Sequence, residues 1–131
     1  VAVKADVDAA ALAANARRML LEKTVGAIRD ALREQCLACY QSCQRMALNH
    51  CLERGGRHVE PQHFRLMIDC AEICRTSAAF MLSGSPRHRL TCGVCAEVCR
   101  ACADSCEQLG DMQDCVDACR ACAQSCAEMA D

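Results

Sequence analysis

The segment CGVCAEVCRACADSC, residues 92–106, contains five cysteines separated by alternating steps of three and four positions. Residues at these steps lie on one face of an α-helix, so the segment is predicted to form a helix with a stripe of thiols. Similar spacing recurs in three other segments, and each of them presents sulfur where a helical bundle normally presents leucine or isoleucine. The cysteines in register are Cys36, Cys39 and Cys43; Cys70 and Cys74; Cys92, Cys95, Cys99, Cys102 and Cys106; and Cys115, Cys119, Cys122 and Cys126.

Glycine and proline divide the chain into helix-length segments. Such residues end helices or mark turns, and here they fall at Gly55-Gly56 with Pro61, at Gly84 with Pro86, and at Gly110 with Asp111. We therefore predict helices over residues 31–54, 60–83, 86–109 and 111–130, with Ser85 as an N-cap and Gly110 as a C-cap residue. Short connections imply antiparallel neighbours, and no segment alternates apolar and polar residues as a strand does.

The fold predicted from this pattern is all-α, an antiparallel up-down four-helix bundle with a cysteine-lined core. A length of 131 residues suits a single domain, residues 1–131. Residues 1–30 are rich in alanine and lack cysteine, and they are predicted to form an additional N-terminal helical extension. The apolar positions of this extension continue the helical stripe directly into Cys36: Leu21, Val25, Ile28 and Leu32.

Composition narrows the classes of function. Fifteen cysteines in 131 residues exceed the share of roughly 8–10% that signals a disulfide scaffold or a metal site in a short chain. A net charge of −2 and the lack of basic runs paired with aromatic residues argue against nucleic-acid binding. No apolar run reaches the ~18 residues of a membrane span. Neither a Ser/His/Asp set, nor a phosphate loop, nor a pair of catalytic carboxylates can be argued, so the protein is not predicted to be an enzyme.

Three interpretations of the cysteines compete. As small hydrophobes, fifteen cysteines with almost no leucine beside them would pack poorly. As disulfides, an odd number leaves one thiol over, and Cβ atoms one helical turn apart are separated by ~5–6 Å, whereas a disulfide needs ~3.5–4.5 Å. As metal ligands, soft thiolates favour Cu(I), Zn or iron–sulfur clusters, and closed sets of four ligands are usual for Zn. The continuous spacing therefore favours Cu(I), which accepts two thiolates.

The amount of copper follows from charge. Two metal–sulfur bonds span ~4.5 Å, a distance that cysteines four residues apart on one helix can reach. Fifteen buried thiolates without counter-ions would be prohibitively costly to desolvate, and near one Cu(I) per thiolate the core becomes neutral. We therefore predict a load on the order of a dozen or more Cu(I) ions per chain, bound as protons leave the thiols.

The two ends of an antiparallel bundle collect different residues. Cys51 lies outside the strict register, near the edge of the same face, and joins a group of sulfur and nitrogen donors at one end. We predict that these residues form a mouth that passes Cu(I) inward and outward, and that the opposite end is closed by a hydrophobic plug. The mouth is Met46, His50, Cys51, His63, Met67 and Met112; the plug is Ile28, Leu32, Phe80, Met81, Leu90 and Met129, with His88 beside it.

The cysteine-striped segments resemble a known family. DCAEICR, CAEVCRACADSC and CVDACRACAQSC, with C-x3-C pairs on all four helices, are similar to the four-helix-bundle copper storage proteins (Csp family), over residues 33–130. The resemblance implies a bacterial, thiol-lined bundle that stores many Cu(I) ions as a homotetramer. The cysteines that match the family are those in register on the four helices. Met46, His50, His63 and Met67 differ from the family pattern, because they stand at positions where cysteine-richer members carry cysteine.

Two other functions stay open at this point. The thiols would form disulfides in a redox protein that senses oxidants, although such a protein favours exposed cysteines of low pKa. A Zn(II) buffer of the metallothionein type is the second alternative. A cytoplasmic location is expected, or an exported, periplasmic one if a leader was removed before Val1. Copper chaperones and copper-requiring enzymes are the expected partners.

Overall fold

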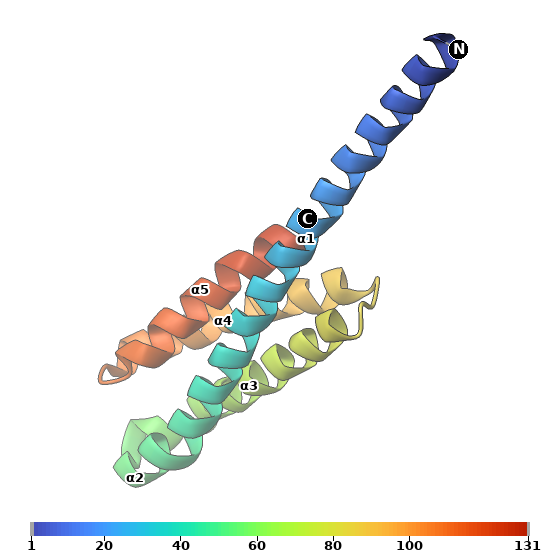
Figure 1. Ribbon diagram of the computed structural model, residues 1–131. Helices are drawn as coiled ribbons and strands as arrows, with labels where there is room; N and C mark the ends of the chain where they lie inside the picture. Colours follow the sequence, from blue (N-terminus) through green and yellow to red (C-terminus); the bar gives the residue numbers. More distant parts are fainter. Residues whose placement is uncertain (1, 131) are drawn as a thin grey trace. The chain divides into compact units, whose positions relative to one another are not determined.

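The computed structural model describes the backbone of residues 2–130 and the side chains of residues 8–130, and this part of the chain contains helices and no strand. Its long elements are three helices of the bundle and one helix that begins in the N-terminal extension (Figure 1). The elements are α1 (Ala2–Arg45), a π-helix (Met46–Cys51), α2 (Leu52–Arg54), a 3-10 turn (Gly56–Val59), α3 (Pro61–Leu82), α4 (His88–Leu109) and α5 (Gln113–Ala130).

The chain forms two compact units, residues 1–30 and residues 31–131. In the second unit α3 packs against α4 and α4 against α5, while thiols of α1 contact thiols of α3 and α5. Consecutive long helices run in opposite directions (Figure 1). The prediction of an all-α, antiparallel four-helix bundle with an added N-terminal helical segment is confirmed. The assignment of all 131 residues to one domain stays a prediction.

Residues 8–30 of the first unit are almost entirely exposed. Val25 and Ile28 lie open to solvent, although both were predicted to continue the apolar stripe into the core. No helix in the described part of the chain has an apolar run long enough to span a bilayer.

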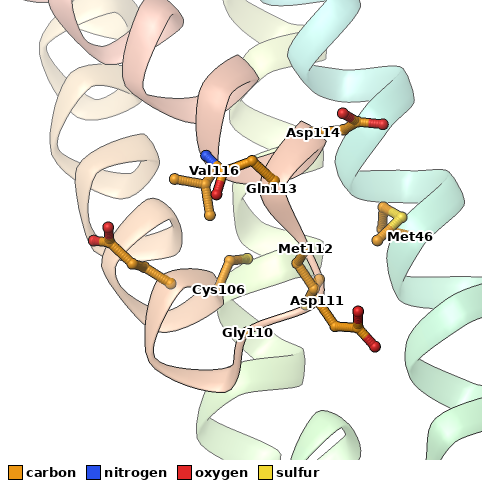
Figure 2. A pocket seen from close by; sticks show the side chains of 9 residues that line it. Met46, Cys106, Gly110, Asp111, Met112, Gln113, Asp114 and Val116 are labelled. Carbon is orange, nitrogen blue, oxygen red and sulfur yellow. The ribbon is translucent and has the colours of Figure 1, made fainter.

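The helix ends follow from local chemistry. Pro61 occupies the first turn of α3, where its missing N–H costs no hydrogen bond. Gly110 ends α4 at a φ of 76°, a conformation that glycine adopts freely. The connection from Gly110 through Met112 then leads directly into α5 (Figure 2). α4 begins at His88 rather than at Pro86, because the hydroxyl of Ser85 accepts a hydrogen bond from the Arg87 N–H and caps a preceding turn.

Most residues of the bundle core are small. All fifteen cysteines are 0% exposed, and alanines fill the positions between them. The two largest fully buried side chains are methionines, Met67 and Met112. The predicted cysteine-lined core is therefore the core that the structure contains.

Candidate metal centre

The buried thiols form one continuous ladder. Within it, four groups of four cysteines have all Sγ atoms within 4.8 Å of one another. Neighbouring groups share Cys122, Cys39, or both Cys43 and Cys119, so they are not four separate closed sites. The groups are Cys36, Cys95, Cys122 and Cys126; Cys39, Cys74, Cys99 and Cys122; Cys39, Cys43, Cys70 and Cys119; and Cys43, Cys102, Cys115 and Cys119.

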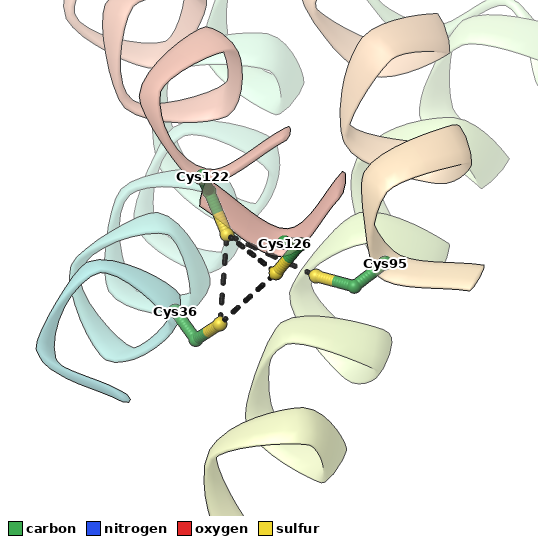
Figure 3. A group of neighbouring side chains, drawn as sticks. All are labelled: Cys36, Cys95, Cys122 and Cys126. Carbon is green, nitrogen blue, oxygen red and sulfur yellow. Dashed lines mark hydrogen bonds between the residues drawn. The ribbon is translucent and has the colours of Figure 1, made fainter. Parts of the chain in front are cut away.

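The group at one end of the ladder shows how the helices build such a set. Cys36 comes from α1, Cys95 from α4, and Cys122 and Cys126 from successive turns of α5 (Figure 3). The Sγ atom of Cys36 lies 3.6 Å from that of Cys126 and 3.6 Å from that of Cys122, and Cys95 Sγ lies 3.8 Å from Cys122 Sγ. Three helices therefore place their sulfur atoms around one point.

Sulfur separations along the ladder suit a shared ion and not a disulfide. The closest thiols, Cys74 and Cys99, are 3.4 Å apart, whereas a disulfide bond is ~2.05 Å long. Bonds of about 2.3 Å to one tetrahedral ion would separate two sulfurs by roughly 3.8 Å. Pairs one turn apart on the same helix also converge, with 4.0 Å between Cys39 and Cys43 and 3.7 Å between Cys95 and Cys99. An ion can thus bind two, three or four thiolates after small side-chain movements.

The described side chains place no buried lysine or arginine in this core to neutralise thiolates. Among the residues whose side chains are described, no lysine or arginine is buried, and the buried polar residues are Ser42, His58, His63 and Ser77. Isolated buried anions are too costly to persist. Deprotonation of the ladder therefore requires cations that enter from outside the chain.

A sulfur-lined pocket opens beside the ladder at the connection between α4 and α5. We call it the sulfur pocket; Met46, Cys106 and Met112 line it together with Asp111 and Asp114, and its volume is about 330 Å³. Figure 2 shows Met46 facing Met112 across it. Met46 is half-buried, whereas Met112 is buried. The pocket therefore leads from an accessible thioether to buried sulfur.

Met67 continues this path inside the bundle. Its Sδ atom accepts hydrogen bonds from the thiols of Cys106, at 3.3 Å, and Cys102, at 3.5 Å, and Cys115 Sγ lies 4.0 Å away. Because Cys102 and Cys115 belong to a four-cysteine group, Met67 connects Cys106 of the sulfur pocket to the ladder.

The remaining predicted mouth residues gather around Cys51 and not around the sulfur pocket. We call Cys51, His58 and His63 the histidine cluster. Cys51 Sγ lies 3.9 Å from His58 Nδ1 and 3.8 Å from His63 Nε2. The ring of His50 packs edge-on against His58, with 5.2 Å between centroids. The mouth predicted as a single group is therefore divided into two sites of different chemistry.

The π-helix explains how Cys51 joins the histidine cluster. Counted in α-helical steps from Cys43, Cys51 is predicted at the edge of the inner face. A π-helix has i→i+5 hydrogen bonds and takes more residues for each turn, so residues at its end are rotated back toward the core. Cys51 is accordingly fully buried, and His50 beside it is half-buried.

Burial controls protonation in the histidine cluster. Desolvation lowers the pKa of both His58 and His63, because a charged imidazolium is poorly solvated there. Desolvation also raises the pKa of Cys51 to about 11. At neutral pH the cluster therefore holds neutral imidazoles, ready to bind a metal, and a thiol that must lose its proton first.

The family of the chain follows from a comparison with family models. The model described as "Csp: Copper storage protein" matches residues 26–131. The chain belongs to the copper storage protein family. Solved copper storage proteins share its bundle. The Cu(I)-bound BsCsp3 of Bacillus subtilis is 32% identical, with a TM-score of 0.73, over 79% of this chain and 99% of its own.

Two further solved structures are similar to this chain. The Nmul_A1745 protein from Nitrosospira multiformis is 58% identical, with a TM-score of 0.78, over 79% of this chain and 95% of that one. A cytosolic copper storage protein from Streptomyces lividans, described with five coppers, is 32% identical over 80% of this chain and 96% of its own, with a TM-score of 0.66.

The sequence did not lead us to predict that His58 lies in the histidine cluster of this copper storage protein. Gly55 and Gly56 both have positive φ values, 65° and 55°, and they let the chain reverse so that the 3-10 turn returns His58 to Cys51. The only available signal was the position of His58 in a glycine-rich turn between two candidate ligands, Cys51 and His63. A turn of this kind has no helical register from which a direction can be predicted.

The predicted hydrophobic plug agrees with the structure only in part. Leu32 and Met81 are buried in the core, and Met129 packs against the core. Leu90 is 70% exposed, Ile28 is exposed, and Phe80 is half-buried outside the core cluster. His88 donates its Nδ1 proton to the Ser85 carbonyl at 2.9 Å, so it serves the turn before α4.

Proposed function

We propose that this copper storage protein stores and buffers many Cu(I) ions on the thiolates of its bundle core. The observation that carries the proposal is the continuous ladder of buried free thiols, in a core where no described lysine or arginine is buried. Soft thiolates select Cu(I), and each ion brings the single positive charge that one thiolate needs. The copper-bound relatives from Bacillus and Streptomyces support the same cargo.

The proposed ligands are those predicted from the sequence. The cysteines carry the capacity, while thioethers and imidazoles at the mouth pass ions to them because these groups bind without losing a proton. The set is Cys36, Cys39, Cys43, Cys51, Cys70, Cys74, Cys92, Cys95, Cys99, Cys102, Cys106, Cys115, Cys119, Cys122 and Cys126, with Met46, His50, His63, Met67 and Met112 at the mouth.

Anaerobic titration of the reduced, metal-free protein with Cu(I) tests this function. We expect saturation on the order of a dozen ions or more per chain, with a parallel loss of thiols that react with a chromogenic reagent. Zn(II) titrated in the same way should saturate at far fewer ions, because a divalent ion on four thiolates leaves excess negative charge.

Each rival function has a distinct signature in this experiment. Saturation at one or two Cu(I), or preferential uptake of Zn(II) at equal concentration, would contradict copper storage. Rapid conversion of the thiols to disulfides by a mild oxidant, at the expense of copper capacity, would favour the redox function instead.

The wider biology is inferred from the same features. A role in storage needs no catalytic group, so we infer that the protein is not an enzyme. The cytosolic description of the Streptomyces relative supports a cytoplasmic location. A homotetramer is proposed from the resemblance to the family, and copper chaperones or copper-requiring enzymes are the proposed donors and recipients.

Replacing both thioethers of the sulfur pocket should slow copper loading without changing capacity. In Met46→Leu/Met112→Leu the volume is conserved while the two thioether donors between solvent and Cys106 are lost. We expect a several-fold slower transfer of Cu(I) from a chromogenic chelator in stopped-flow measurements, and the wild-type end point. Met129→Leu, a half-buried methionine outside the sulfur pocket, is the matched control. Equal rates in all three proteins would show that Cu(I) enters elsewhere.

A further inference from the structure

The histidine cluster differs from the ladder in its donor set. The ladder offers sulfur alone, whereas Cys51, His58 and His63 offer one thiol and two imidazole nitrogens, all buried and within 4.8 Å of one another. Metal–sulfur and metal–nitrogen bonds of about 2.3 and 2.0–2.1 Å around a tetrahedral Zn(II) separate S and N by roughly 3.6 Å. The observed separations of 3.8 and 3.9 Å admit such an ion after shifts of a few tenths of an ångström.

A second layer of contacts orients the ligands. His63 Nδ1 lies 2.8 Å from the Oγ atom of Ser105 on α4. With the Nδ1 proton donated to that hydroxyl, the Nε2 lone pair faces Cys51. Histidines that bind metals commonly donate their other ring proton in this way. The site thus has a positioned imidazole before any ion binds.

A fourth donor lies next to the cluster. His50 Nε2 is buried and has no hydrogen-bond partner among the described residues, and its ring contacts His58. Buried polar atoms without a partner are rare because leaving them unsatisfied costs free energy. His50 therefore offers a buried, unpartnered nitrogen beside the cluster, although it lies outside the set of donor atoms that are within 4.8 Å of one another.

Charge separates the preference of this cluster from that of the ladder. Imidazole is a good ligand for divalent Zn(II). A set of sulfur ligands alone binds Cu(I) at least as well as it binds Zn(II). One thiolate and neutral imidazoles leave Zn(II) with a net charge of +1, at an end of the bundle. Four buried thiolates around Zn(II) carry −2 and require four deprotonations in the core.

We propose that Cys51, His58 and His63 form a binding site for a single Zn(II)-like divalent cation, distinct from the Cu(I) ladder. The site does not depend on copper storage. Because Cys51 and His63 also belong to the proposed mouth, bound Zn(II) withdraws them from copper transfer, so the site links zinc supply to copper uptake.

X-ray absorption at the zinc edge tests the proposal without any copper. One equivalent of Zn(II) is added to the reduced, metal-free full-length protein. We expect a mixed first shell, with one sulfur at about 2.3 Å and nitrogen or oxygen donors at about 2.0–2.1 Å. A first shell of three or four sulfurs would place the ion in the ladder and overturn the proposal.

Variants identify the ligands by their effect on the affinity for the first Zn(II), measured by competition with a chromogenic chelator. His58→Ala/His63→Ala should abolish the mixed first shell of sulfur and nitrogen. Ser105→Ala should lower the affinity for the first Zn(II) by about 10- to 100-fold, because it removes the hydrogen bond that positions His63. His88→Ala, a half-buried histidine outside the cluster, should bind like wild type. Far-ultraviolet circular dichroism, compared with wild type, verifies that each variant is folded. Unchanged first-zinc affinity in the double variant would overturn the proposal.

Discussion

Replacing Cys39 and Cys119 with serine is expected to remove more copper capacity than replacing any two cysteines outside the four-cysteine groups. Cys39 and Cys119 each belong to two groups, so three of the four groups lose at least one ligand. Cys119 Sγ alone lies 3.7 Å from Cys39, 3.5 Å from Cys43 and 3.8 Å from Cys70. When a sulfur that bridges several ions is removed, each of those ions loses a ligand and is no longer bound.

The matched control removes the same number of thiols. Cys92 and Cys106 are as fully buried as Cys39 and Cys119 but belong to none of the four groups. Cys92→Ser/Cys106→Ser should therefore lose no more than two ions in the anaerobic Cu(I) titration, whereas Cys39→Ser/Cys119→Ser should lose clearly more than two. Far-ultraviolet circular dichroism of both variants checks that the helices remain.

The comparison between the two double variants tests the ladder itself. If both lose two ions, each Cu(I) is held by its own pair of thiols and the shared geometry has no functional consequence. A larger loss in Cys39→Ser/Cys119→Ser indicates bridging sulfurs, which is the arrangement that allows nearly one ion for each thiolate and a neutral core.

The ladder was predictable from sequence because it is regular. A step of three or four residues assigns a side chain to one helix face without further information, and thiols on four such faces meet along one axis. The bundle and the burial of Cys36, Cys99 and Cys122 follow directly. The structure adds which thiols are shared between groups, since this depends on the relative heights of the helices, which spacing within one helix does not determine.

Irregular backbone limited the prediction at the mouth. Cys51 reaches the core through a π-helix, and His58 returns to it through a 3-10 turn. Neither element leaves a periodic pattern in the sequence. Leu90 shows the converse limit: its apolar character suggested a plug, but it lies in the first turn of α4 and is 70% exposed.

Loading with Cu(I) is expected to raise the thermal unfolding midpoint of the protein by more than about 15 °C. An ion at 1,000 times its Kd stabilises the folded state by about 4 kcal/mol, and for a bundle of about 100 residues each kcal/mol shifts the midpoint by roughly 4–8 °C. The groups join α1 to α4 and α5 through Cys36, Cys95 and Cys126, so each ion links helices that must separate on unfolding. Anaerobic circular dichroism melts of metal-free and loaded protein measure the difference, and removal of copper by a chelator should restore the lower midpoint.

This stabilisation bears on how copper is released. If loaded and metal-free proteins melt together, the ions contribute nothing to the fold and local opening of the bundle can free them. If the loaded protein is far more stable, unfolding is too rare to serve as a release route, and ions must leave by exchange onto ligands that reach the accessible end. The half-buried thioether of Met46 and the path from Cys106 to Met67 offer such a route. The release rate should then rise with the concentration of a competing thiol or chelator, while concentrations of urea that leave the loaded protein folded should hardly change it.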